Sequence, residues 1–193
     1  MTGEEVRKHL PGLDALASPC TRHACIDIWL EMLEQGGWRE KGLENCPGAI
    51  DPKIDRRENC FEHTRHVADV CLAIADALAA IDRYPACNRE DLLAGALVHD
   101  VGKLIEYDID ETGAPCKTEK AKYFSHPTTG AYLAKRHGLN DNVVHMILTH
   151  STKRSPDGPN AYNTPESLIL KYADELCYKY VEIHSAQERK QPR

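Results

Sequence analysis

Six side chains of the kinds that bind metal ions stand along this chain in separate segments. They are His63, the adjacent pair His99 and Asp100, His126, His150 and Asp174. Four imidazoles and two carboxylates suit a divalent transition-metal ion better than Mg²⁺ or Ca²⁺, which prefer oxygen ligands. A carboxylate such as Asp100 has two oxygens and can contact two ions, whereas each imidazole offers one nitrogen. The series predicts a metal site with one or two ions, inside a helical bundle that brings the six side chains together.

The first of these residues lies on the clearest amphipathic helix, which is predicted over residues 63–82. Its apolar residues recur at helical spacing. At about 100° per residue, His63 falls about 30° from the centre of the apolar stripe and His66 about 90° away. We therefore expect His63 to point into the core and His66 to lie at its edge.

An apolar helix is predicted next, over about residues 89–100, with Asn88 as its N-cap. It ends at His99 and Asp100. Burying two such polar groups beside another inward histidine is costly unless something compensates them. The metal is a better explanation than mutual hydrogen bonding alone. Gly102 then allows the backbone to turn closely.

The remaining ligand candidates also fall on predicted helices. Further helices are expected over residues 3–9, 22–34, 127–136, 140–150 and 164–184. His126 starts one of them, and His150 shares a face with Ile147 on the next. A histidine in either position is often only a satisfied core residue, which is the alternative here. His145 is expected on the opposite, solvent-exposed face, and Asp174 at the edge of the apolar stripe of the last helix.

Three segments are not predicted as helix. Residues 38–60 contain Pro47, Gly48 and Pro52 and are expected to form a loop wrapping the core. Alternation of apolar and acidic residues followed by a turn predicts a small β-hairpin over about 104–118. The hairpin is either a flap over the site or an ordinary surface hairpin. Residues 151–163 are expected to be a polar loop that, with the hairpin, sets the choice of substrate.

The composition indicates an ordinary globular protein. The chain has 193 residues, of which 41% are hydrophobic and 6% aromatic, enough to bury a core. No apolar run is long enough to span a membrane and the start does not resemble a signal peptide, so a cytoplasmic protein is expected. The eight cysteines form no CxxC pair and are expected to be reduced thiols.

Charge is unevenly distributed. The chain carries a net charge of −6, which argues against duplex nucleic acid as a partner. Residues 117–154 nevertheless hold seven basic and two acidic side chains, a local net charge of +5. This basic band is either an ordinary solvated surface or a local field that attracts an anionic substrate.

Five motifs in this order resemble those of the HD-domain metal-dependent phosphohydrolases. They are Glu62-His63-Thr-Arg-His, Leu97-Val98-His99-Asp100-Val-Gly102-Lys103, His126-Pro127-Thr-Thr-Gly130, Ile147-Leu-Thr-His150 and Tyr172-Ala173-Asp174. The resemblance covers about residues 58–180. It implies an all-α helical bundle around one or two divalent ions. We therefore expect an N-terminal helical extension over 1–57, an HD domain over 58–184 and a tail over 185–193.

The resemblance also implies roles for the metal ligands. The family's four core ligands fall on His63, His99, Asp100 and Asp174, and two-metal branches add histidines that match His126 and His150. Asp100 would bridge the ions. Fe or Mn suits this shell best, and Zn, Ni and Co are compatible. The cyclic-dinucleotide branch has a His-His-Glu stretch, whereas this chain reads Thr149-His150-Ser151, so that activity is not expected.

The activity implied is hydrolysis of a phosphate ester of a small metabolite or nucleotide by a metal-activated water. Two ions about 3.5–4 Å apart can acidify a shared water and hold a phosphoryl oxygen. Asp100 and Lys103 are the expected catalytic residues, with Lys103 binding phosphate as a point charge rather than being an ordinary solvated lysine. His66, Glu62 and Arg65 are candidates to assist the leaving group.

Two other functions fit the same ligands. Some di-iron members of the wider family resemble oxygenases with a four-His, two-Asp shell. A non-catalytic nucleotide-binding regulator is the third reading, disfavoured because no ligand is missing. The sequence does not fix the oligomeric state.

Overall fold

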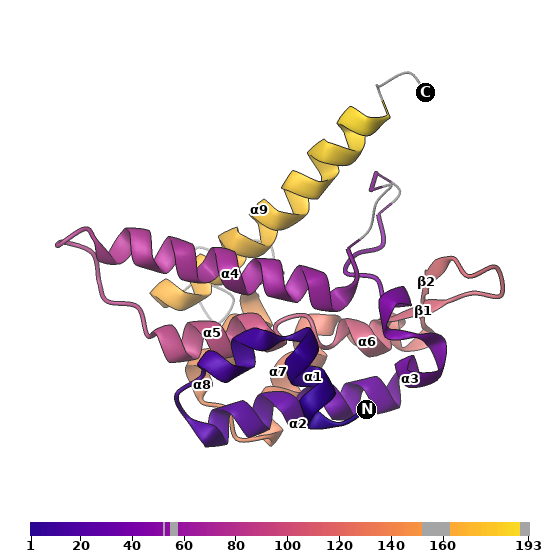
Figure 1. Ribbon diagram of the computed structural model, residues 1–193, viewed down its shortest axis with the longest axis horizontal. Coiled ribbons are helices and arrows are strands. Elements are labelled where there is room, and N and C mark those ends of the chain that lie inside the picture. Colours follow the sequence, from indigo (N-terminus) through magenta and orange to yellow (C-terminus); the bar gives the residue numbers. More distant parts are fainter. Residues whose placement is uncertain (52, 55–57, 152–162, 190–193) are drawn as a thin grey trace.

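The computed structural model describes residues 1–51, 53–54, 58–151 and 163–189. The described chain forms a helical bundle with one small hairpin, which confirms the predicted all-α fold (Figure 1). No helix among the described residues is long and apolar enough to cross a membrane.

The N-terminal region contributes short helical elements and one long helix. They are α1 (Gly3–His9), a 3₁₀ turn (Pro11–Ala15), α2 (Pro19–Gln35), α3 (Trp38–Lys41) and a 3₁₀ turn (Leu43–Asn45). The hydroxyl of Ser18 caps α2, so the helix begins three residues earlier than predicted. Residues 38–60 were expected to form a loop, but α3 and the second 3₁₀ turn lie within this segment.

Asparagines cap the two helices that position the first three candidate ligands, His63, His99 and Asp100. In α4 (Cys60–Ala79), Asn59 and Glu62 form a reciprocal capping box. In α5 (Arg89–Val98), the side chain of Asn88 accepts a hydrogen bond from the backbone N–H of Asp91. Every residue from Asp91 to Val98 is buried, because α5 packs against α2, α4, α8 and α9. This central position places the end of α5, and with it His99 and Asp100, inside the bundle.

A single helical turn, α6 (Lys103–Glu106), follows immediately and leads into the hairpin. Its strands are β1 (Tyr107–Ile109) and β2 (Pro115–Lys117), paired antiparallel with Tyr107 opposite Lys117. The predicted hairpin is therefore present, but residues 104–106 are helical. Gly113 supplies the positive φ of 81° at its turn.

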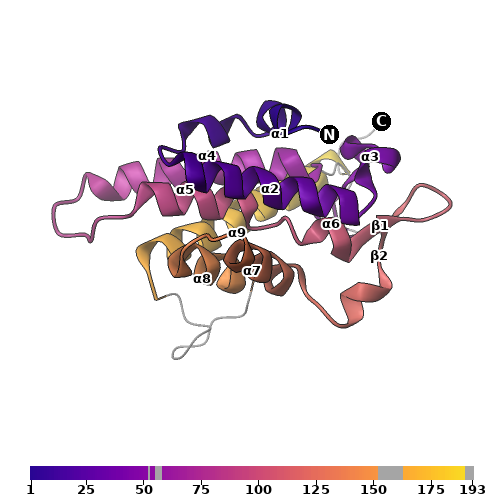
Figure 2. The ribbon, with the colours of Figure 1, turned by 90° about the horizontal axis from the view of Figure 1, so that it is seen from below.

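Three helices complete the bundle. They are α7 (His126–Arg136), α8 (Asp141–Thr149) and α9 (Pro165–Glu188). α7 and α8 pack as a pair on one side of α5, while α1 and α2 lie on the other (Figure 2). α9 packs beside α4, α5 and α8 in its first half and projects from the body in its second half (Figure 1).

Two tryptophans tie the N-terminal region to the helices of the site. The indole N–H of Trp29 on α2 donates to the carbonyl of Leu97, at 2.8 Å. The indole N–H of Trp38 on α3 donates to the carbonyl of Leu104, at 2.6 Å. Both rings are fully buried in one core shared by the N-terminal region and the later helices. The carbonyls at the two ends of the His-Asp turn are therefore held by side chains from outside the matched motifs.

Candidate metal centre

All six predicted ligands come together in the structure, although they come from five helices. His63 lies on α4, His99 and Asp100 follow α5, His126 begins α7, His150 caps the end of α8 and Asp174 lies on α9. Their ligand atoms form two groups that share Asp100, and within each group all ligand atoms lie within 4.8 Å of one another. One group is His63, His99, Asp100 and Asp174, and the other is Asp100, His126 and His150.

Asp100 belongs to both groups because each of its oxygens faces a different pair of histidines. Its Oδ2 lies 3.3 Å from Nε2 of His63 and 3.3 Å from Nε2 of His99. Its Oδ1 lies 3.5 Å from Nε2 of His126 and 3.4 Å from Nε2 of His150. Two ligand atoms that each stand about 2.1 Å from one ion are about 3.0–3.4 Å apart. The separations match shared coordination better than short hydrogen bonds.

The second carboxylate completes only the first group. Oδ1 of Asp174 lies 3.1 Å from Nε2 of His63 and 3.9 Å from Nε2 of His99. The first group therefore offers four ligands, two of them carboxylates. The second offers two imidazoles and the other oxygen of Asp100.

The chemistry of the buried atoms fits metal ions. Nδ1 of His99 lies 2.7 Å from the carbonyl oxygen of Ala96, and Nδ1 of His150 lies 2.6 Å from that of Ile147. An N–H at each Nδ1 leaves a lone pair on Nε2 that points into the site. Among the described residues, no hydrogen-bond partner is found for these two Nε2 atoms or for Oδ1 of Asp100, all buried. Such groups are rare without a compensating ligand.

The pKa shifts of the ligands show the same demand for positive charge. Burial lowers the pKa of His63, but Asp100, Asp174 and Glu58 raise it more, so its pKa lies well above the usual value. A metal cation between these carboxylates would offset their negative charge, as the proton on His63 does. Burial also lowers the pKa of His150, with Asp100 acting in the opposite direction, so this imidazole favours the neutral form that binds metals.

Glu106 orients His126 and was not anticipated. Its Oε2 accepts the backbone N–H of His126 at 2.7 Å and lies 2.8 Å from Nδ1 of the same residue. Burial alone would raise the pKa of Glu106. Hydrogen bonds and charge from His126 and Lys117 outweigh this effect and lower the pKa to about 2. A carboxylate on the far nitrogen of a histidine ligand fixes the ring and increases its basicity. The alternation around Glu106 predicted a strand, whereas this residue lies on the helical turn α6 and its side chain is buried.

Glu58 has a similar position beside His63 and His66. Its Oε2 lies 3.6 Å from Nδ1 of His63, and its Oε1 lies 2.7 Å from Nδ1 of His66. The side chain of His66 is 50% exposed, as expected for the edge of the stripe. Glu62 is used in the capping box of α4. Of the three residues proposed to assist the leaving group, His66 alone has a carboxylate contact that leads to a metal ligand.

Lys103 is buried against the site. Its ammonium nitrogen lies 2.5 Å from Oδ2 of Asp100 and 2.6 Å from the carbonyl oxygen of Gly48. Burial lowers the pKa of Lys103, but Asp100, Tyr107 and Asp174 together raise it above its usual value, so the side chain stays charged. It is not an ordinary solvated lysine.

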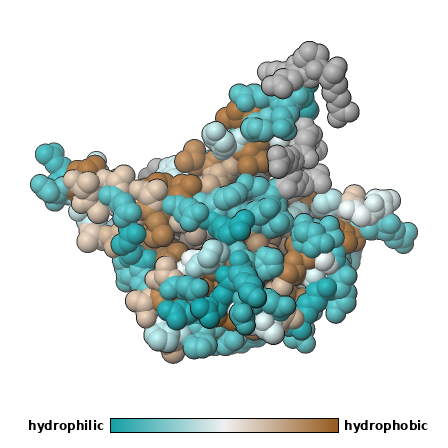
Figure 3. All heavy atoms as spheres, in the orientation of Figure 1, coloured by the Kyte–Doolittle hydropathy of each residue, from teal (hydrophilic) through white to brown (hydrophobic). Residues whose placement is uncertain are grey.

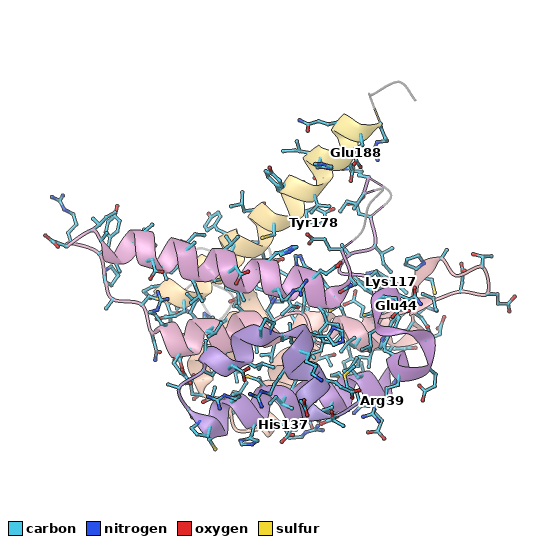
Figure 4. The ribbon with its side chains drawn as sticks, viewed as in Figure 1. Arg39, Glu44, Lys117, His137, Tyr178 and Glu188 are labelled. Atoms are coloured by element: carbon cyan, nitrogen blue, oxygen red, sulfur yellow. The ribbon has the colours of Figure 1, made fainter. Side chains whose placement is uncertain are left out.

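A cavity of about 360 Å³ opens beside the centre. Its walls include His63, Lys103, His126 and Asp174, together with the loop from Gly48 to Asp51 and the side chains of Lys171, Tyr178 and Lys179 on α9. Figure 4 labels Tyr178 on α9. The tyrosine hydroxyl bonds the carboxylate of Asp51, which ties the loop to α9. The segment once expected to be only a wrapping loop therefore forms one wall of the site.

The described lysines and arginines of the basic band do not supply positive charge to this cavity, because none of them lines it. Lys117 pairs with Glu106, behind His126, and Lys122, Lys135 and Arg136 pair with acids away from the site. Lys153 and Arg154 lie outside the described residues. The basic residues of the cavity are instead Lys103, Lys171 and Lys179. The expected polar loop over 151–163 also falls almost wholly outside the described residues.

His145 departs from its predicted position. It was expected to be solvent-exposed, but it is half-buried and its Nε2 is buried without a hydrogen-bond partner among the described residues. The reason is that α8 packs against α5, α7 and α9, so little of its surface is left open.

Comparison with known proteins gives a consistent set of relatives. Ribonuclease Y of Thermotoga petrophila is 28% identical over 129 residues, covering 67% of this chain and 20% of that protein. Dihydroneopterin 2',3'-cyclic phosphate phosphodiesterase of Methanocaldococcus jannaschii is 28% identical over 141 residues, covering 73% of this chain and 55% of that protein. The 3'-5' exoribonuclease YhaM of a Geobacillus species is 32% identical over 124 residues, covering 60% and 38%. No solved structure matches.

The chain therefore spans between about a fifth and about half the length of these relatives. The region that the HD domain model matches includes all six candidate ligands. Because the HD domain model matches residues 60–179, more than half of the chain, this protein belongs to the HD domain family, as its motifs predicted.

Proposed function

We propose that this protein is a metal-dependent phosphohydrolase that cleaves a phosphate ester of a small metabolite or nucleotide. The observation that carries this proposal is the placement of Asp100, whose two oxygens each face a separate pair of imidazoles. That arrangement suits two neighbouring ions, the geometry used for in-line displacement at phosphorus.

The ligand set favours Fe or Mn, with Zn, Ni and Co compatible. His63, His99, Asp100 and Asp174 would hold one ion, and Asp100, His126 and His150 the other. When bound, such ions polarise a phosphoryl oxygen and lower the pKa of a bound water.

The remaining residues prepare the site for an anion. Lys103 places a permanent positive charge next to Asp100 and one wall of the cavity. Lys171 and Lys179 add positive charge along α9, each paired with a glutamate of the same helix, Glu175 and Glu182. We assign Lys103 to stabilising negative charge on the substrate's phosphoryl group, because its ammonium is fixed by two acceptors.

His66 is assigned to proton delivery to the leaving alkoxide, through Glu58. His66 does not line the 360 Å³ cavity, but Glu58 lines it and also lines a second cavity of about 300 Å³ that contains His66. The 2.7 Å contact between these side chains gives a path for a proton from the half-exposed imidazole.

The relatives support the reaction class. The names of all three describe enzymes that cleave phosphoester bonds: a ribonuclease, a cyclic phosphate phosphodiesterase and an exoribonuclease. Two of the names describe enzymes that act on RNA and the third names a small cyclic phosphate, so together they support the bond that is broken more than the molecule that carries it. The eight free thiols fit a reducing compartment, and we propose a cytoplasmic enzyme.

A panel of phosphate monoesters, diesters and cyclic phosphates tests the proposal. The protein is loaded with Mn²⁺ and assayed without oxygen, and an Fe-loaded sample is followed for O₂ consumption. We expect phosphate-ester cleavage that needs no oxygen and is lost in Asp100→Ala. Asp69→Asn, an exposed carboxylate on α4, serves as the matched control and should remain active.

Other outcomes point to the alternatives. Turnover only with Fe and O₂ would favour an oxygenase. A protein that binds no metal and is inactive in both assays would favour a regulator. Either result overturns the hydrolase.

A further inference from the structure

An exposed apolar stripe runs along α9. It consists of Leu168, Tyr172, Leu176, Tyr180 and Ile183. These residues recur every three or four positions, so they lie on one side of the helix and span about 22 Å along its axis. Each is between 44% and 71% exposed. In Figure 3, hydrophobic atoms are interspersed with hydrophilic ones along the projecting part of this helix.

The stripe is large for a surface with no partner. With about 200 Å² of full surface for each side chain, the five residues expose roughly 550 Å². The largest apolar patch of a typical monomer is about 300–600 Å², and such patches are often functional. A stable interface buries about 800 Å² on each partner, so the stripe supplies about two thirds of what one side needs.

We propose that the stripe on α9 is the interface of a homodimer, in which the α9 helices of two chains pack antiparallel across a twofold axis near Leu176. Leu176 lies at the centre of the stripe, so a twofold axis there places Leu168 of one chain near Ile183 of the other. Such a pairing buries the same patch on both copies and closes the assembly at two chains.

The charges beside the stripe favour this orientation. Glu175 and Lys179 flank it on the same side, with side chains about half exposed. In an antiparallel pair about Leu176, Glu175 of one chain and Lys179 of the other are offset by about 3 Å along the axis, within reach of an ion pair. The twofold axis also places Lys179 of the first chain beside Glu175 of the second. A parallel pair would instead place this flank against the one with Tyr180 and Gln187, which carry no charge.

The mass of the full chain in solution, measured by light scattering after size-exclusion chromatography, gives the first test. We expect the mass of two 21.6 kDa chains at about 100 μM protein. Leu176→Glu should give the mass of one chain with an unchanged helical circular dichroism spectrum. Tyr123→Glu, which alters a 78% exposed aromatic residue outside the stripe, should leave the dimer intact. A wild-type monomer, or a dimer that Leu176→Glu does not disrupt, overturns the proposal.

A mixing experiment tests the orientation. Glu175→Lys leaves two lysines on the flank of each helix, and Lys179→Glu leaves two glutamates, so each variant alone should dimerise at least tenfold more weakly than the wild type. An equimolar mixture should form a heterodimer, because every cross-chain pair is then opposite in charge. Mixing does not restore the ion pairs within α9 that each substitution removes. Recovery of dimerisation would therefore come from contacts between the two chains. A mixture as monomeric as its components overturns the antiparallel arrangement.

Discussion

The ammonium of Lys103 and the carboxylate of Asp100 form a buried ion pair, with Nζ 2.5 Å from Oδ2. The two residues are three positions apart across the turn that joins α5 to α6, and both are buried. Lys103 offsets the cost of burying the carboxylate that both predicted metal groups share. The pair keeps that carboxylate ionised, because burial raises the pKa of Asp100 but Lys103 and the neighbouring histidines hold it well below its usual value.

Replacing this lysine should expose the charge balance of the site. Without metal, Lys103→Met is expected to lower the free energy of unfolding by about 3–5 kcal/mol, because Asp100 is left buried and uncompensated. Adding Mn²⁺ should stabilise the variant more than the wild type, since the ion then replaces the missing positive charge. Urea unfolding with EDTA and with Mn²⁺ measures both effects. Lys120→Met, on the exposed surface, should change stability by less than about 0.5 kcal/mol. An equal response to Mn²⁺ in variant and wild type would contradict this account.

Metal stoichiometry should separate the two halves of the centre. We expect His150→Ala to bind one ion fewer than the wild type, because it removes a ligand from the second group alone. Asp100→Ala should lose both ions, because its carboxylate serves both groups. Metal analysis of Mn²⁺-loaded and desalted protein gives the number of ions per chain. If the two variants retain the same number of ions, Asp100 does not bridge.

The contact between Glu106 and His126 predicts an effect on metal affinity without loss of a ligand. Glu106→Gln should weaken binding of the second ion about 10–100-fold, since an outer carboxylate orients the ring and increases its basicity. Competition with a chelator measures the change. Lys117→Gln removes only the exposed partner of Glu106, and its side chain is 61% exposed, so a small effect is expected. Equal affinities in Glu106→Gln and the wild type would rule out this role.

Gly102 is needed because another segment passes close to it. A Cβ at this position would overlap the carbonyl oxygen of His126 and lie 2.8 Å from its Cα. Gly102→Ala should therefore displace the start of α7, cost about 1–3 kcal/mol and weaken the second ion. Gly113→Ala, at a positive φ with no atom within 4 Å, should cost about 1 kcal/mol and leave metal content unchanged. Calorimetry and metal analysis of both variants check this, and normal metal content in Gly102→Ala would contradict it.

The ion pair between Glu31 on α2 and Arg136 on α7 should make stability depend on pH. Burial alone would raise the pKa of Glu31, but hydrogen bonds from Arg136 and His137 outweigh this effect, so the pKa lies below its usual value. A carboxyl with a lowered pKa contributes stability above its unfolded pKa of about 4.3, and that stability is lost as pH falls through the folded value. Glu31→Gln should cost less than about 1 kcal/mol at pH 7, and the difference should shrink below about pH 4. Urea unfolding at both pH values gives the comparison, and a constant difference would contradict the prediction.

The helices were predictable because their starts and their buried sides depend on local signals. Asn88 and Thr164 cap the helices that lead to His99 and carry Asp174, and apolar spacing showed which side of the helix with His63 would be buried. The order of the motifs then related ligands that lie far apart in the sequence. The structure brings all six within two overlapping groups.

The surroundings of the ligands were not predictable in the same way. The role of Glu106 depends on a single helical turn where the alternation favoured a strand. The half-buried state of His145 depends on three helices that pack around α8. The tryptophan contacts join residues 66 and 68 positions apart. No periodicity within one segment reports such contacts, because they are set by how the segments pack.

The carbonyl of Gly48, which accepts a hydrogen bond from Lys103, lies twelve residues before the region that the family model matches. A fragment cut to the matched boundaries would lack this acceptor, the cavity wall formed by Ala49 and Asp51, and both indoles that hold the His-Asp turn. The structural support of the candidate site therefore extends beyond the matched region, and we expect a fragment trimmed to residues 60–179 to be less stable than the full chain.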